Sequence, residues 1–285
     1  MIDLYKIDGT KNNDSHLCYN DPESYPLFQE NLSEFKDHIS SLVKNTQSKT
    51  LYKFGDGDYH FLIKNAFGSA KPGNRALSVS YENIDHEKFT EGVLLNDLYT
   101  CELYPQSIDR FHKVVPGKAI NYPTEYLYGL VANKWFFKNL SQIGKIGVIG
   151  AGPKIQLIEM LCEYDEYKDY LGFDGFSDYI TFPQKFACDN IQRTEDIVAE
   201  QLKKSKSNVF LLGIGHAKSA VLHTFKKYRQ AVFIDVGAGI DAIAGCINVN
   251  RPYSGDWTNF RLSHFDYSKV DYLRYTGAGK HKTLK

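Results

Sequence analysis

The sequence has no net charge, few cysteines and no long apolar run. Lysine and arginine together number 34, as do aspartate and glutamate, so no basic excess favours nucleic acid. The five cysteines are widely spaced and form no Cys-x-x-Cys motif, which argues against a disulfide framework or a zinc site. No segment approaches the ~18 apolar residues of a membrane span, and the first 20 residues lack the apolar block of a signal peptide.

These absences favour a cytoplasmic protein with reduced thiols and a local binding site. The basic closing segment 280–285 leaves peripheral membrane attachment open, although a solvated tail is the simpler interpretation. With 285 residues, 42% hydrophobic and 24% charged, the composition is that of a globular protein. The 20 tyrosines and 18 phenylalanines fit sugar-binding surfaces, but they fit a packed core at least as well.

Hydrophobic periodicity predicts alternating helices and strands. Apolar residues from Phe28 to Leu42 recur at spacings of three and four, which predicts a helix of about five turns. Thr50–Phe54 is predicted to be a strand, Gly55–Asp58 its exit turn and Tyr59–Ala66 the next helix. The middle of the chain, from about 68 to 142, carries four prolines and several aromatic clusters, and we interpret it as mostly helical.

The same strand, glycine turn and helix recur in the second half of the chain. The three predicted strands are Lys145–Ile149, Asn208–Ile214 and Ala231–Val236, and each is followed by a turn with two glycines. Strands that alternate with helices form parallel βαβ units, so we expect an α/β fold with a doubly wound, mostly parallel, Rossmann-like sheet. The expected organisation is an N-terminal polar segment and helix (1–47), a catalytic α/β domain (48–250) with a mainly helical insertion at about 68–142, and a C-terminal loop and tail (251–285).

Two carboxylates, Asp56 and Asp58, stand between glycines where the first predicted strand ends. Open α/β sheets bind ligands at this edge. Hard cations such as Mg²⁺ or Mn²⁺ prefer carboxylates together with substrate phosphates, so the pair predicts a divalent metal site. The alternative is an ordinary turn held by Asx hydrogen bonds.

The glycine turns also allow other functions. Gly150-Ala151-Gly152 has the first two glycines of a nucleotide-binding turn, which would suit an enzyme that uses S-adenosylmethionine or a nicotinamide cofactor, but the third glycine is missing. In the turn after Asp235, Asp241 stands in the third glycine's place. These glycines also suit close packing of helices on strands. An inert module that binds a nucleotide or glycan is a further alternative.

The residues Lys-Phe-Gly-Asp-Gly-Asp at 53–58 resemble the Arg-Phe-Gly-Asp-Gly-Glu opening of GT-D-type glycosyltransferases. A second similarity runs from Asn208 to Lys218 and from Phe233 to Gly237, where that family has a closing strand, a glycine turn, a helix and an Asp-Ile-Gly strand end. Together with the Gly150 to Gly152 unit, the resemblance spans roughly residues 48 to 245.

The resemblance implies a metal-dependent glycosyltransferase, with Asp56 and Asp58 binding the Mn²⁺ or Mg²⁺ that holds the donor's diphosphate. The donor would be a nucleoside diphosphate sugar, with UDP favoured, and the acceptor a glycan or glycoconjugate of polysaccharide biosynthesis. Asp58 replaces the family's Glu, which keeps the charge but shortens the reach. Lys53 replaces Arg, which loses bidentate contact with phosphate. The histidine that follows the family's final Asp-x-Gly is Ala238 here.

Further site residues follow from this interpretation. Backbone N–H groups after Gly215 and Gly152 would face phosphates or uridine. Asp235, Asp241 and His216 are the candidates for the general base that the acceptor hydroxyl needs, and each also has a purely structural interpretation. We expect Arg251 near phosphate and Trp257 either stacked on a sugar ring or buried beneath a surface loop. The expected donor-binding residues are Lys53, Gly55, Gly150, Gly152, Gly213, Gly215, Arg251 and Trp257.

Overall fold

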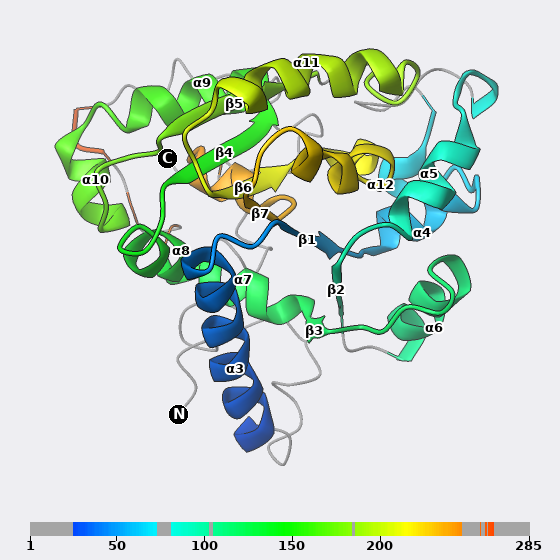
Figure 1. Cartoon of the computed structure of the whole chain (residues 1–285), viewed down its shortest axis with the longest axis horizontal. Helices are drawn as coiled ribbons and strands as arrows, with labels where there is room; N and C mark the ends of the chain where they lie inside the picture. Colours follow the sequence, from blue (N-terminus) through cyan, green and yellow to red (C-terminus); the bar gives the residue numbers. More distant parts are fainter. Residues whose placement is uncertain are drawn as a thin grey trace.

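A seven-stranded sheet forms the centre of the protein (Figure 1). The computed structural model describes residues 25–72, 81–102, 105–183, 186–246, 257, 260 and 262–264. The strands lie in the order β3-β2-β1-β7-β6-β4-β5, and every pair is parallel. They are β1 (Lys49–Lys53), β2 (Leu98–Cys101), β3 (Tyr122–Pro123), β4 (Ile146–Ala151), β5 (Asp178–Phe182), β6 (Val209–Gly213) and β7 (Val232–Asp235). The predicted α/β, doubly wound fold is confirmed.

Helices cover both faces of the sheet, so the central strands β1, β7, β6 and β4 are buried on both sides. Neighbouring residues of β1 show this, because Leu51 packs into one core and Tyr52 into the other. On the Leu51 side lie α3 (Tyr25–Lys44), α7 (Thr124–Ala132), α8 (Trp135–Leu140), α9 (Gly152–Leu161), α10 (Asp165–Leu171) and α13 (Gly239–Ile243). On the Tyr52 side lie α4 (Asp56–Leu62), α5 (His86–Val93), α6 (Pro105–Val114), α11 (Ile191–Lys204), α12 (Lys218–Val221) and the 3-10 turns η2 (Gly68–Ala70), η3 (Tyr81–Asn83), η4 (Gly215–Ala217) and η5 (Leu222–Lys227).

The strongest sequence patterns predicted their elements well. The helix predicted from Phe28 to Leu42 is α3, and its buried Phe35 and Ile39 belong to the same core as β4 and β6. This helix therefore packs against the sheet and shares its core. The predicted strands near 50, 145, 208 and 231 are β1, β4, β6 and β7, with ends shifted by one or two residues.

Most of the described elements in the stretch 68–142 are helices, as predicted, but this stretch also supplies two strands of the central sheet. β2 pairs with β1, and β3 pairs with β2. With four and two residues, these strands are too short to give a clear alternating pattern in the sequence.

Two boundaries near the carboxyl edge also differ from the prediction. α4 begins at Asp56 and not at Tyr59, because Asp58 at the third helical position accepts a hydrogen bond from the Gly55 N–H (2.9 Å). The predicted helix after Gly215 is divided into η4, α12 and η5.

In the described part of the chain, no helix is long and apolar enough to cross a membrane. The cysteines described there, Cys101, Cys162, Cys188 and Cys246, are buried free thiols.

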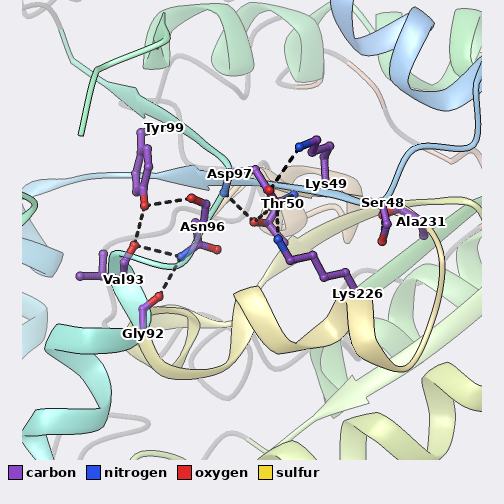
Figure 2. Close-up of polar contacts among 10 residues, drawn as sticks. All are labelled: Ser48, Lys49, Thr50, Gly92, Val93, Asn96, Asp97, Tyr99, Lys226 and Ala231. Carbon is purple, nitrogen blue, oxygen red and sulfur yellow. Dashed lines mark hydrogen bonds and ion pairs between the residues drawn. The ribbon is translucent and has the colours of Figure 1, made fainter. Parts of the chain in front are cut away.

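Asp97 ties the amino end of β1 to its neighbours (Figure 2). One of its oxygens accepts hydrogen bonds from the Thr50 N–H (2.9 Å), the Thr50 hydroxyl (3.0 Å) and Lys226 Nζ (2.7 Å). The other oxygen lies 3.4 Å from Lys49 Nζ. Burial raises the pKa of Asp97, but the hydrogen bonds from Lys226 and Thr50 outweigh burial and hold that pKa below its ordinary value. This network fixes the strand whose other end enters the candidate site.

We predict that Asp97→Asn lowers the free energy of unfolding by about 1–3 kcal/mol at pH 7. Because the folded pKa is depressed, this contribution is complete above the ordinary pKa of 3.8 and is lost as the pH falls through the lower folded value. Urea unfolding of both proteins at pH 7 and near pH 3 measures the difference. Glu200→Gln, which alters an exposed pair with Lys203, is the control and should leave the midpoint unchanged. An Asp97 effect that stays constant down to low pH would contradict this account.

Candidate functional site

The carboxyl ends of β1, β7 and β6 lie side by side, and charged groups from all three meet there. Lys218 Nζ lies 3.0 Å from Asp58 Oδ2 and 2.7 Å from Asp235 Oδ2, and it also donates to the backbone carbonyl of Lys53. We call Asp58, Lys218 and Asp235 the acid–lysine cluster. The segment after β1 therefore lies against residues some 160 to 180 positions downstream.

The Lys218 ammonium donates hydrogen bonds to Asp235 and to the Lys53 carbonyl, and it forms an ion pair with Asp58. Its side chain is only 8% exposed, and Nζ lies 4.4 Å from the centre of the Tyr52 ring. A buried charge of this kind is stable only where paired carboxylates compensate for its lost hydration. Lys218 therefore offsets one of the two carboxylate charges from inside the cluster.

Asp235 joins β7 to β1. It accepts from the Lys53 N–H (3.3 Å) and the Gly237 N–H (2.9 Å) as well as from Lys218. The side chain is 1% exposed. Its oxygens are therefore engaged in holding the two strand ends and the turn at Gly237.

Asp56 and Asp58 have different surroundings. Asp58 turns inward to Lys218 and the Gly55 N–H, whereas Asp56 is exposed and accepts from the N–H of Gly57 (2.8 Å). The two residues are two positions apart at the start of α4, so their side chains leave the helix in different directions. In this arrangement they do not form one two-carboxylate site, and shared metal binding by the pair stays a prediction.

Three oxygens nevertheless surround a cation at this edge of the sheet, and that cation is the Lys218 ammonium. The oxygens are Asp58 Oδ2, Asp235 Oδ2 and the Lys53 carbonyl, which are the hard oxygen ligands that Mg²⁺ and Mn²⁺ prefer. Within the described residues, no group of three or more His, Cys, Asp or Glu side chains is arranged to hold a metal. A divalent ion at this edge would therefore need backbone or substrate oxygens beside the carboxylates.

Lys53 carries a second ammonium to the same edge. Its half-buried side chain passes the Tyr128 ring, with Nζ 5.2 Å from the ring centre. A Cβ added to Gly237 or Gly55 would lie 3.7 or 3.9 Å from Nζ, so Lys53 runs between the turns that follow β7 and β1. Among the described residues it forms no ion pair, in contrast to Lys218.

His216 is buried and stacks on Phe61, with ring centres 4.8 Å apart. Its Nε2 lies 3.2 Å from the Ser69 carbonyl, which accepts only, so Nε2 carries the proton. Nδ1 has no hydrogen-bond partner in the described part of the protein. Burial lowers the pKa of His216, although the charge of Asp58 acts in the opposite direction. The histidine is therefore neutral at pH 7, and it is packed between Phe61 and the Ser69 carbonyl.

Asp241 lies on the other face of the sheet and does not join the acid–lysine cluster. It pairs with Lys154 of α9, and both side chains are largely buried. The structure therefore separates two of the predicted base candidates, with Asp235 in the cluster and Asp241 in a second ion pair.

Four of the five predicted donor-binding glycines fall into two groups, and Gly55 has only ordinary contacts at 3.8 and 3.9 Å. A Cβ at Gly213 would lie 2.2 Å from the Gly237 carbonyl oxygen, and one at Gly150 would lie 3.2 Å from Ile240, so both glycines allow close packing. A Cβ at Gly152 or Gly215 would meet nothing within 4 Å. Only this second pair leaves open space beside the backbone.

Trp257 is buried and not available to stack on a ligand. It is 2% exposed, and its Nε1 donates to the Val131 carbonyl (3.2 Å) among the rings of Phe137 and Tyr170. The structure therefore supports the alternative that Trp257 pins a loop onto the core. Arg251 lies outside the described residues.

Sequence reasoning missed Lys218 and Tyr52 as site residues. Lys218 was visible inside the Gly215-His216-Ala217-Lys218 motif, and its charge in an otherwise apolar segment was the available signal. Tyr52 lies beneath Lys218, and its hydroxyl is 2.7 Å from that of Ser219. Burial, followed by the negative charge of Asp58, raises the pKa of Tyr52 well above its ordinary value. Tyr52 therefore stays a neutral hydroxyl.

A groove of about 560 Å³ lies at the opposite edge of the sheet, by the amino ends of β4 and β5. Lys145, Lys168, Asp174 and Ser177 are among its lining residues. The acid–lysine cluster does not border it. We place the candidate site at the carboxyl edge because ligands of open parallel sheets bind there.

We predict that Gly213→Ala lowers the free energy of unfolding by about 1–3 kcal/mol, because the new methyl group overlaps the Gly237 carbonyl. Gly152→Ala should change it by less than about 0.5 kcal/mol, because the added methyl group meets only open space. Urea unfolding of the two variants makes the comparison. Equal losses of unfolding free energy in the two variants would show that the two turns are packed alike, contrary to this description.

Searches with protein-family models, curated proteins and solved structures each find no match for this chain. What the site can do therefore depends on its own residues and their geometry.

Proposed function

We propose that the protein is a glycosyltransferase that takes a sugar from a nucleoside diphosphate donor, with UDP-sugars favoured, and passes it to a glycan or glycoconjugate acceptor. The observation that carries the proposal is the Lys53 ammonium. It lies at the carboxyl edge between two glycine turns and has no ion pair among the described residues. A cation in this position suits the negative charge that grows on a leaving diphosphate.

The surroundings of Lys53 favour an anionic ligand that binds together with a divalent cation. Lys218 is already balanced by Asp58 and Asp235, so it adds no free positive charge. The exposed Asp56 at the start of α4 repels bare phosphate, but it suits a divalent ion whose other oxygens come from phosphates. When bound, such an ion would offset part of the charge on the leaving diphosphate.

The remaining contacts come from backbone and glycine positions. Gly152 begins the ten-residue helix α9 and leaves open space beside its backbone, and because Pro153 has no N–H, the first turn would offer an anion or a nucleoside the N–H groups of Gly152 and Lys154. Gly215 adopts a positive φ of 61°, which side chains disfavour, and it keeps the turn after β6 open. These features support a donor that lies across the ends of β1, β7, β6 and β4.

The base candidates differ in what they offer. Asp235 is the one carboxylate of the predicted candidates that lies in the cluster, and we propose it as the first to test. His216 keeps an unprotonated Nδ1, but Phe61 and the Ser69 loop enclose the ring. Asp241 is held by Lys154 on the far face.

The rival functions find less support in the geometry. In a dinucleotide-binding sheet the phosphate-binding glycine turn follows the first, central strand. Here that position holds Gly55-Asp56-Gly57-Asp58, and the turns after β4 and β6 use Gly150 and Gly213 for packing. A methyltransferase and an inert binding module stay as alternatives for the experiment to separate.

The test is hydrolysis or transfer from a panel of UDP-, GDP- and dTDP-sugars, with and without Mn²⁺. We expect turnover with at least one donor. Absence of turnover with every donor, together with a thermal shift by S-adenosylmethionine and none by UDP, would reverse the choice in favour of a methyltransferase. Binding of UDP without any turnover would favour the inert module.

We predict that Lys53→Gln lowers kcat/KM for the donor by about 10- to 1,000-fold, because the leaving diphosphate loses its cationic partner. The matched control is Lys49→Gln, at the opposite end of β1, which should leave kcat/KM within about twofold. Steady-state kinetics of both variants measure the effect. Equal kcat/KM values for the two variants would show that Lys53 does not contact the donor.

A further inference from the structure

Glu102 directly follows β2 at the carboxyl edge, beside the end of β1 that carries Lys53. In the parallel register Lys53 lies opposite Thr100, and Glu102 comes two residues later in the chain. Both charged residues contact Tyr128 of α7. The Tyr128 hydroxyl donates to Glu102 Oε1 (3.1 Å), and Lys53 Nζ lies 5.2 Å from the centre of the ring. A carboxylate and an ammonium therefore flank one tyrosine at the ends of neighbouring strands.

Two carboxylates lie near this point, and Glu102 is the accessible one. Burial raises the pKa of the Cys101 thiol, the charges of Glu102 and Glu125 raise it further, and the charge of Lys53 lowers it, so all three charges lie close to Cys101. Glu125 is 1% exposed, whereas Glu102 is half-buried. In the described part of the chain, Glu102 has no ion-pair partner and its Oε2 accepts no hydrogen bond.

A carboxylate with open acceptor positions suits two neighbouring hydroxyl groups. Each carboxylate oxygen can accept two hydrogen bonds, so Glu102 can keep its bond from Tyr128 and still accept from two hydroxyls. Such bonds are stronger than those between neutral groups because the acceptor is charged. The 2′- and 3′-hydroxyls of a ribose are a pair of this kind, whereas a 2′-deoxyribose offers only the 3′-hydroxyl.

The position of Glu102 in the sheet also favours a ribose. β1 lies inside the sheet, and β2 and β3 follow it in turn toward one edge (Figure 1), which is the strand order in one half of a nucleotide-binding sheet. In such sheets the phosphates lie at the end of the first strand, and an acidic residue farther along the chain binds the ribose. This chain shares the strand order but not the glycine turn of dinucleotide enzymes, so the similarity concerns where a nucleoside lies.

We infer that Glu102 binds the ribose hydroxyls of the donor nucleotide and thereby selects a ribonucleotide over its 2′-deoxy counterpart. The inference rests on the proposed function for the presence of a nucleoside diphosphate. It places the nucleoside at the end of β2, with the diphosphate beside Lys53. Tyr128 is a positioning residue, since its hydroxyl holds Glu102 and its ring lies against Lys53. UDP-sugars then suit the site, and dTDP-sugars are poor donors.

Isothermal titration calorimetry with UDP and with 2′-deoxy-UDP, with Mg²⁺ present throughout, tests this inference. We expect the natural chain to bind UDP about tenfold more tightly, which corresponds to one hydrogen bond to a charged group. In Glu102→Ala the two affinities should agree within about twofold. The ratio is taken within each protein, so a loss of stability that affects both nucleotides alike cancels.

Three further variants separate the contacts. Tyr128→Phe keeps the ring against Lys53 but removes the hydroxyl that holds Glu102, so we expect the ratio to fall to about threefold. Lys53→Gln should weaken both nucleotides and leave the ratio at about tenfold, because Lys53 faces the diphosphate and not the ribose. The matched control is Glu200→Ala, which alters an exposed pair with Lys203 on α11 and should change neither affinity.

Equal affinity of the natural chain for UDP and 2′-deoxy-UDP, or no binding of either, would overturn the inference. So would a tenfold ratio that survives in Glu102→Ala, since another group would then contact the 2′-hydroxyl. Because the readout is nucleotide binding, tenfold discrimination without transfer from any sugar donor would refute the proposed transferase and leave this result standing. Transfer without discrimination would do the reverse.

Discussion

The buried contact between Lys218 and the carboxylates of Asp58 and Asp235 is the interaction on which the candidate site depends. Through Lys218 Nζ it connects α4, which follows β1, and α12, which follows β6, with the end of β7. A buried ion pair seldom adds much net stability, because dehydration of the charges offsets their attraction. Its role here is to fix the geometry. A buried charge without its partner would be strongly destabilising, so the three segments that carry the charges are held in one arrangement.

The rest of the edge follows from this arrangement. Asp235 also accepts from the turn at Gly237, and Asp58 also accepts from the N–H of Gly55. Lys53 runs between those two turns with its ammonium unpaired among the described residues. At the opposite edge, Asp97 holds the amino end of β1 to Thr50 and Lys226. The strand that carries Lys53 is thus fixed at both ends by carboxylates.

Much of the fold was predictable because its signals are local. α3 has a long apolar stripe, and β1, β4, β6 and β7 are apolar runs that end in glycine turns. β2 and β3 were missed because a strand of four or two residues has no periodicity of its own and forms only by pairing with its neighbour, β2 with β1 and β3 with β2. The start of α4 was placed too late because the Gly55 to Asp58 hydrogen bond makes a helical turn of what resembles a loop.

The nearness of the strand ends at the carboxyl edge was predictable, but the pairing of the charged groups there was not. Strand ends of a parallel sheet meet at one edge, which brought Asp58 and Asp235 together as expected. The partner of both is Lys218, and nothing in the spacing of residues 160 positions apart reveals which carboxylate a lysine will meet. The sequence left the role of Trp257 open for a related reason. Its burial depends on contacts with Val131 and Phe137, which lie more than 100 residues away in the chain.

The most direct test of the account is a crystal structure of the chain with UDP and Mn²⁺. The account predicts that the diphosphate lies at the carboxyl ends of β1 and β7, with an oxygen within hydrogen-bond distance of Lys53 Nζ. UDP bound in the groove at the amino ends of β4 and β5, or bound at the carboxyl edge without contact to Lys53, would contradict it.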